Sequence, residues 1–246
     1  MKFDPINNAY SFEIFETIGL KTLVTTRNSF GHPDFNLTLK RQSSEERQKK
    51  IQMVQQHLKT EFPIVFPHQI SKDNIWIIDH DKTPQEADAV ISNRRDIGIG
   101  ILTADCLPII LCDPQTKYIS LIHAGWRGVL ANLTTKTIVA MSERGCTPRS
   151  MLAAIGPSIS PAVYEVGLDV SELFFNAGYS KYLKVKNREK YYLDLWGIVL
   201  EQLTNNGILA QNIEFSNLCS YQNPAFYSAR RDGANTGRFA TIALWQ

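Results

Sequence analysis

Residues 103–128 constrain the fold of this chain more than any other segment. Two short apolar runs lie within it, Leu107–Cys112 and 118–122, and the turn sequence DPQTK at 113–117 separates them. Asp-Pro readily starts a turn. Runs that are apolar on both faces are typical of buried central strands. We therefore expect two neighbouring strands in the centre of a sheet.

Two reactive side chains lie at matching ends of these predicted strands. Cys106 immediately precedes the first strand, and His123 follows the second. A thiol next to an imidazole is either a pair of metal ligands or a nucleophile with its base. After His123, AGWRG leads into the helical pattern of residues 129–141, and amide groups at a helix N-terminus can receive an anion. The segment predicts an enzyme and leaves both chemistries open.

The remaining elements predict an α/β domain that borders on α+β. The expected strands are 10–15, 20–26, 62–66, 74–78, 98–102, 150–155, 213–218 and 238–244, and the other expected helices are Ser44–Leu58, 170–176 and 192–204. Strands outnumber helices and do not alternate strictly with them, which favours mixed sheets flanked by helices. No repeat or linker interrupts the chain, so we expect one layered domain over residues 1–246.

Composition limits the classes of partner. The 246 residues carry a net charge of +2 without a strongly basic or acidic run, so neither nucleic acid nor an anionic membrane is expected. The apolar runs are shorter than the ~20 residues that span a bilayer. The first residues lack the apolar segment of a signal peptide, and the four cysteines form no C-x-x-C pair. We expect a cytoplasmic protein, and the sequence leaves its oligomeric state open.

Motifs along nearly the whole chain resemble one known family. They are TTR at 25–27, FNL at 35–37, ADAVISN at 87–93, TADC-P with HAGWRG between 103 and 128, IGPSISPAVYEVG at 155–167 and LCSYQNPAFYSARRDGANTGR at 218–238. The chain resembles the YfiH-like family, also called the laccase-domain or polyphenol oxidase family. This resemblance implies a layered domain related to the catalytic fold of cytotoxic necrotizing factor. It also implies a zinc-dependent purine nucleoside phosphorylase that uses phosphate and adenosine, inosine or methylthioadenosine, with adenosine deaminase as a side activity.

The resemblance implies that Cys106 and His123 bind zinc, but it leaves the third ligand in question. Matching PHQ at 67–69 to the family motif puts Ser71 where the family has a histidine. A serine hydroxyl is a poor zinc ligand. His68 is the fallback, and it needs a bulge to reach the same face of a strand. We expect an incomplete zinc site and a weakened activity. Copper is not expected, because the histidine-rich clusters of copper oxidases are absent from the sequence.

Further residues complete the predicted site. The planar fork of arginine suits phosphate, and Arg127 in the HAGWRG motif is expected to take part in catalysis. The residues expected to bind substrate or phosphate are Arg27, Asn36, Arg230, Asp105 and Glu165.

Two other functions stay open at this point. A metal-free hydrolase of the deamidase type would use Cys106 as nucleophile and His123 as base. A non-catalytic descendant would bind a nucleoside or a protein partner without turnover. Metal content and the reactivity of Cys106 toward alkylation distinguish these readings.

Overall fold

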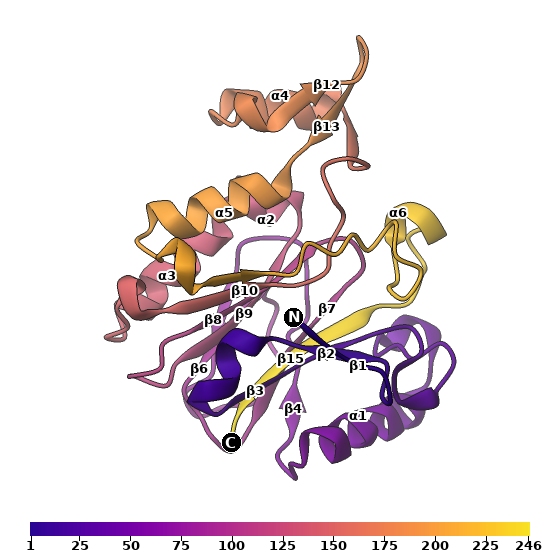
Figure 1. Ribbon diagram of the computed structural model, residues 1–246, viewed down its shortest axis with the longest axis vertical. Coiled ribbons are helices and arrows are strands. Elements are labelled where there is room, and N and C mark those ends of the chain that lie inside the picture. The colour runs from indigo at the N-terminus through magenta and orange to yellow at the C-terminus, as the bar shows by residue number, and fades with distance from the viewer.

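Figure 1 shows a computed structural model of the chain, which describes residues 1–246 apart from the side chain of Lys40. Two six-stranded sheets pack face to face. The first contains, in spatial order, β1 (Lys2–Asp4), β2 (Ala9–Ser11), β3 (Leu20–Thr25), β15 (Phe239–Trp245), β7 (Gly98–Thr103) and β4 (Ile64–Val65). The second contains β14 (Ile213–Phe215), β10 (Leu152–Ile155), β8 (Leu107–Cys112), β9 (Ile119–Ala124), β6 (Ala89–Ser92) and β5 (Ile75–Ile77).

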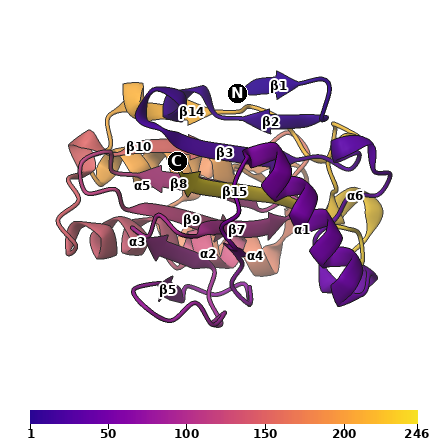
Figure 2. The same cartoon turned by 90° about the horizontal axis from the view of Figure 1, so that it is seen from below.

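Both sheets are mixed, as the irregular order of elements predicts. Most neighbouring strands are antiparallel, whereas β4 runs parallel to β7, β14 to β10 and β5 to β6. Helices cover the outer faces. The helix α1 (Ser44–Leu58) lies across the first sheet (Figure 2). The helices against the second sheet are α2 (Trp126–Leu130), α3 (Leu133–Ser142) and α5 (Leu195–Asn205).

The central strand β8 shows why the apolar runs fold this way. Leu107, Ile109 and Leu111 pack under the helices, and Ile110 and Cys112 point into the layer between the sheets. All six residues of β8 are buried, so apolar residues at every position are required rather than an alternation. The predicted bounds of this strand are confirmed.

Helix α1 also has its predicted bounds, because both ends are defined by local chemistry. The Ser43 hydroxyl accepts a hydrogen bond from the amide of Glu46 at 3.1 Å, which caps the N-terminus. At the other end Lys59 adopts a left-handed conformation. The buried residues Ile51, Val54 and Leu58 lie on one face of the helix.

Three predicted elements differ from the structure. The helix expected over 129–141 is broken at Asn132, whose positive φ of 58° separates α2 from α3. The hydroxyl of Tyr179 and the amide of Gln202 both donate to the Asn132 side chain and hold this break. The helix expected from 192 begins at Leu195, where Asp194 caps it. In the opening hairpin, β2 and β3 do pair, but the 3-10 helix η1 (Glu13–Ile18) lies between them.

A third sheet was not anticipated. Strands β11 (Glu165–Gly167), β13 (Lys190–Leu193) and β12 (Leu183–Val185) form it, and α4 (Leu168–Asn176) packs on them. This lobe extends from the end of the molecule opposite α1 (Figure 1). The short helix α6 (Ala229–Asp232) and the 3-10 turns η2 (Ser29–Gly31), η3 (Leu39–Arg41), η4 (Pro148–Ser150), η5 (Ser180–Tyr182) and η6 (Ala210–Asn212) complete the fold. None of the helices in the described chain is long and apolar enough to cross a membrane.

The packing of the two sheets yields a stability prediction. Ile110 is 0% exposed between them, so Ile110→Ala should leave a cavity and lower the free energy of unfolding by roughly 2–5 kcal/mol. Val139 on α3 is 48% exposed, and Val139→Ala should change it by no more than about 0.5 kcal/mol. Urea denaturation measures both values. Similar losses for the two variants would contradict this assignment of the core.

Candidate functional site

The antiparallel pairing of β8 with β9 brings Cys106 and His123 together. Pro108 pairs with His123 and Leu107 with Ala124, so Cys106, just before β8, lies beside the end of β9. The thiol lies close enough to the imidazole to act on its charge. Cys106 is partly exposed, whereas the other cysteines, Cys112, Cys146 and Cys219, are buried. The structure thus gives one accessible thiol, and it contacts an imidazole.

A buried carboxylate, Asp88, holds the imidazole from the other side. Asp88 immediately precedes β6, is 0% exposed, and its Oδ1 accepts the Nδ1–H of His123 at 2.7 Å. The backbone amide of His123 also donates to the Asp88 carbonyl oxygen at 2.7 Å. With Nδ1 directed at Asp88, Nε2 is the nitrogen that faces Cys106. This fixes the orientation of the ring relative to the thiol.

The same carboxylate organises the loop at residues 70–72. The amides of Ile70, Ser71 and Lys72 donate to Asp88 at 3.2, 3.0 and 2.8 Å. Ser71 has a positive φ of 57°, which turns successive N–H groups toward one anion. Asp88 therefore joins residue 71 to His123 through a single carboxylate group.

Charge and burial act in opposite directions on these groups. Burial alone would raise the pKa of Asp88, but the hydrogen bonds from His123 and Lys72 outweigh it and the pKa is lowered. Burial alone would lower the pKa of His123, but the negative charge of Cys106 and the hydrogen bonds to Asp88 and Cys106 raise it to about 10. The buried imidazole therefore carries its proton on Nδ1 toward Asp88, and its charged form is favoured.

The turn before Cys106 is held by the carboxylate of Asp105. This residue has a φ of 94°, which is rare outside glycine, and its carboxylate accepts the hydroxyl of Ser220 and the amide of Arg230, both at 2.7 Å. Its carbonyl accepts the amide of Ile159 at 2.9 Å. Asp105 was predicted to bind substrate. In the structure its carboxylate and carbonyl groups instead accept hydrogen bonds that anchor the turn before Cys106 to two other loops.

Gly125 permits the start of α2 to approach the thiol. A Cβ atom at this position would lie 3.0 Å from Sγ of Cys106, closer than side chains normally pack. The HAGWRG motif therefore places the start of α2 directly against the sulfur of Cys106.

Two of the predicted arginines border this pair. The Arg230 side chain donates to the Glu165 carbonyl oxygen at 2.7 Å and stacks on Tyr164, and Arg127 stacks on Trp126. Burial raises the pKa of Tyr164 and the charge of Cys106 raises it further, while Arg230 and Arg127 lower it. Tyr164 therefore lies within electrostatic reach of the thiol and of both guanidinium groups.

Three other predicted residues have different neighbours. The Arg27 guanidinium pairs with Asp232 and stacks on Tyr227. Asn36 is buried, and its side-chain amide donates to the Asp34 carbonyl oxygen at 3.3 Å. The Glu165 carboxylate lies on the lobe, where hydrogen bonds from lysines lower its pKa to about 2. The structure does not bring these three side chains into contact with Cys106 or His123.

The sequence analysis did not name Asp88 or Arg238 as site residues, although the sequence around Asp88 carries a signal. Asp88 lies within ADAVI, where a carboxylate among apolar residues indicates burial with a partner. Arg238 ends the C-terminal motif at 218–238, but nothing in that motif indicated that it lies near Cys106. Its position became clear only from the pairing of β15 with β7.

The residues present do not complete a metal site. In the described part of the chain, no group of three or more His, Cys, Asp and Glu side chains is arranged to hold an ion. The backbone amide of Ser71 donates to the same Asp88 oxygen as His123 Nδ1, and the side chain of residue 71 is a hydroxyl, which is a poor zinc ligand. His68 is exposed, and its backbone forms a bridge with Glu86. The donor set stops at Cys106 and His123, which is short of the three protein ligands of a catalytic zinc site.

Comparison with known proteins identifies the family. A family model described as multi-copper polyphenol oxidoreductase laccase matches residues 22–246. The chain belongs to this laccase-domain, YfiH-like family. Adenosine deaminase RL5, from an unknown prokaryotic organism, is 35% identical over 192 residues, which cover 72% of this chain and 73% of that protein. Purine nucleoside phosphorylase YfiH of Shigella flexneri is 30% identical over 185 residues, 74% and 73% of the two chains.

The fold agrees with solved structures of family members. The crystal structure of a hypothetical protein YfiH from Bacillus licheniformis superposes with a TM-score of 0.90 at 23% identity, covering 100% of this chain and 98% of that one. The predicted family and α/β fold class are confirmed. The enzyme names of the relatives support an enzymatic role for the YfiH-like chain.

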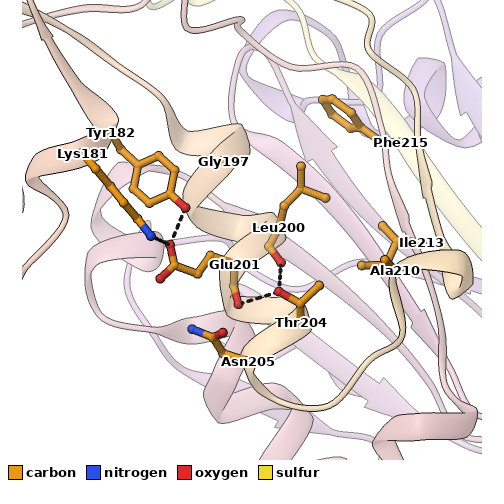
Figure 3. Close-up of a pocket in the computed structure, with 10 residues that line it drawn as sticks. All are labelled: Lys181, Tyr182, Gly197, Leu200, Glu201, Thr204, Asn205, Ala210, Ile213 and Phe215. Carbon is orange, nitrogen blue, oxygen red and sulfur yellow. Dashed lines mark hydrogen bonds and ion pairs between the residues drawn. The ribbon is translucent and has the colours of Figure 1, made fainter.

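A separate surface hollow of about 560 Å³ lies along α5, next to η5 and β14 (Figure 3). Its charged groups satisfy one another, since Lys181 and the hydroxyl of Tyr182 both contact the Glu201 carboxylate. Neither Cys106 nor His123 lines it. This hollow is not part of the candidate site.

The hydrogen bonds of Asp88 predict a large effect of Asp88→Asn. Asn has one acceptor oxygen where Asp88 has two, so in either orientation two of the four donors lose their acceptor and the free energy of unfolding should fall by roughly 3 kcal/mol. Asp73, whose ion pair with Lys136 is exposed, gives the control: Asp73→Asn should cost no more than about 1 kcal/mol. Denaturant unfolding compares them. An Asp88→Asn variant as stable as the control would disprove the role of the carboxylate.

The motif alignment, which puts Ser71 where the family has a histidine, predicts a gain in metal binding. Ser71→His should supply the missing ligand and raise zinc affinity roughly ten- to a hundred-fold or more, on the scale that metal-site changes produce. Titration calorimetry with zinc measures the gain, and Ser71→Ala is the control expected to show none. Equal affinities for the two variants would mean that residue 71 does not face Cys106 and His123.

Proposed function

We propose that this YfiH-like protein is a purine nucleoside phosphorylase with adenosine deaminase as a side activity. One observation carries the proposal. Asp88 is hydrogen bonded to His123, whose imidazole lies next to the partly exposed thiol of Cys106, and Arg127 and Arg230 near this thiol have no carboxylate ion-pair partner among the described residues. The names of relatives at 30–35% identity support a reaction on purine nucleosides.

The chemistry of phosphorolysis matches these groups. A phosphate oxygen forms a bond to C1′ of adenosine, inosine or methylthioadenosine as the C1′–N9 bond breaks. The electron pair leaves with the base, which takes up one proton while phosphate gives up one. The products are the free purine and a ribose 1-phosphate. In the side reaction, water replaces the amino group at C6 of adenosine and ammonia leaves.

The chain can meet the two requirements of this reaction with its own groups. The arginines supply forked donors for phosphate. His123, whose Nδ1 is bound to Asp88, presents Nε2 as the position at which a proton is held or passed on. Such a proton carrier typically accelerates a reaction by roughly 10²–10⁴-fold.

Zinc has no assigned step in this proposal. The family resemblance implies it, but Ser71 leaves the donor set one ligand short. We therefore expect phosphorolysis to be weaker than in a relative with a complete site.

The direct test incubates purified protein with phosphate and adenosine, inosine or methylthioadenosine, with and without added zinc. Release of adenine, hypoxanthine or methylthioadenine that requires phosphate supports the proposal, and ammonia release from adenosine measures the side activity. Binding of nucleoside without any turnover would instead identify a non-catalytic descendant. The proposal is contradicted if the protein neither binds a nucleoside nor releases a purine base under any of these conditions.

A thiol variant separates catalysis from folding. Cys106→Ala should lower phosphorolysis at least about a hundred-fold, because it removes a group that contacts His123. The thiol is partly exposed, so the free energy of unfolding should change by less than about 1 kcal/mol. Cys112→Ala, in the buried core, should show the opposite pattern. Unchanged activity together with a large loss of stability would identify Cys106 as a packing residue.

A second candidate function rests on a specific observation, the carboxylate behind His123. A thiol next to an imidazole that is hydrogen bonded to a buried carboxylate matches the arrangement of cysteine hydrolases. Sγ of Cys106 would bond to an amide carbonyl carbon, the C–N bond would break, and ammonia would leave with the thiol proton. Water would then hydrolyse the thioester. Ammonia release from a glutamine peptide, lost after alkylation of Cys106, supports this function; its absence excludes it.

A further inference from the structure

Strand pairing places Arg238 next to the turn through Asp105 that leads to Cys106. Arg238 immediately precedes β15, whose first residue Phe239 pairs with Thr103 at the end of β7. The chain then turns through Asp105 to reach Cys106. Two segments more than a hundred residues apart in sequence thus meet beside the thiol.

The guanidinium of Arg238 is held in place without a carboxylate partner. Nη1 donates to the carbonyl oxygens of Thr236 and Gly237 at 2.7 and 2.9 Å, and Nη2 donates to that of Ala234 at 3.2 Å. Among the described residues, no Asp or Glu forms an ion pair with it. The carboxylate of Asp105 is near enough to act on its charge but already accepts Ser220 and the Arg230 amide.

Burying the charged guanidinium of Arg238 is unfavourable unless an anion binds next to it. Arg238 is only partly exposed, and burial lowers its pKa, while the charges of Cys106 and Asp105 raise it. A desolvated cation without a counter-ion is unfavourable. The guanidinium therefore stands within electrostatic reach of the thiol with its charge uncompensated by an ion pair.

Neighbouring arginines show the contrast. Arg231 pairs with Asp232 and donates to several carbonyl oxygens, and Arg27 pairs with the same carboxylate. Both have their charge balanced within the protein. Arg238 does not, although all three lie in or near the C-terminal motif.

We propose that Arg238 is a substrate-binding residue that receives inorganic phosphate and so selects phosphate rather than water as the nucleophile. This inference rests on the proposed function and names the residue that separates its two reactions. The carbonyl contacts fix the plane of the fork, which suits two-pronged binding of a phosphate. Deamination uses water and needs no anion at this position.

The test compares the two reactions in the same variants. Arg238→Ala should raise the KM for phosphate in phosphorolysis roughly ten- to a hundred-fold, the effect of losing charge-assisted hydrogen bonds. The rate of adenosine deamination should stay within about three-fold. Arg238→Lys, which keeps the charge and loses the fork, should raise the KM by an intermediate factor. Arg95→Ala, at an exposed position, is the control and should change neither reaction.

Two results would overturn the role of Arg238 in phosphate binding. An unchanged KM for phosphate overturns the inference, and so does an equal loss of both reactions in folded Arg238→Lys protein, which would indicate a structural role. If the unmodified protein catalyses neither reaction, the proposed function fails while the inference is tested by calorimetry with inorganic phosphate alone. Binding to the unmodified protein that is lost in Arg238→Ala, weakened in Arg238→Lys and kept in Arg95→Ala then supports it; no binding to the unmodified protein overturns it.

Discussion

The buried carboxylate of Asp88 is the interaction on which the candidate site depends. It accepts the imidazole of His123 and the amides of residues 70–72 at 2.7–3.2 Å, so one anion satisfies donors from two separate segments. A buried carboxylate without such donors would be neutral or unfavourable. Because it has them, it fixes the ring of His123 and the loop of Ser71 in one arrangement. Cys106 then meets an imidazole whose orientation is already set.

Sheet register supplies the rest of the site. The pairing of β8 with β9 brings the thiol to the imidazole, and the pairing of β15 with β7 brings Arg238 to the same turn. The layers behind these strands are fully buried, so the register cannot slip without exposing apolar side chains. Asp105 couples the turn before Cys106 to the C-terminal motif.

The sequence predicted what local patterns and motifs encode. Leu107–Cys112 and Ser44–Leu58 were assigned correctly, because a doubly buried strand and a serine-capped helix leave clear signals. The pairing of Cys106 with His123 followed from their places at matching strand ends. The break at Asn132 was missed because side chains from other elements, Tyr179 and Gln202, stabilise it. For the same reason no local pattern revealed the neighbours of Arg238 or the lysine contacts of Glu165.

The central claim is that Asp88 fixes the protonated nitrogen of His123. Long-range ¹H–¹⁵N correlation spectra of ¹⁵N-histidine-labelled protein report which ring nitrogen carries a proton, and His123→Asn identifies the resonance. The account predicts a proton on Nδ1 that persists across neutral pH in the unmodified protein and shifts or is lost in Asp88→Ala. A neutral ring with a bare Nδ1 and its only proton on Nε2 would contradict it.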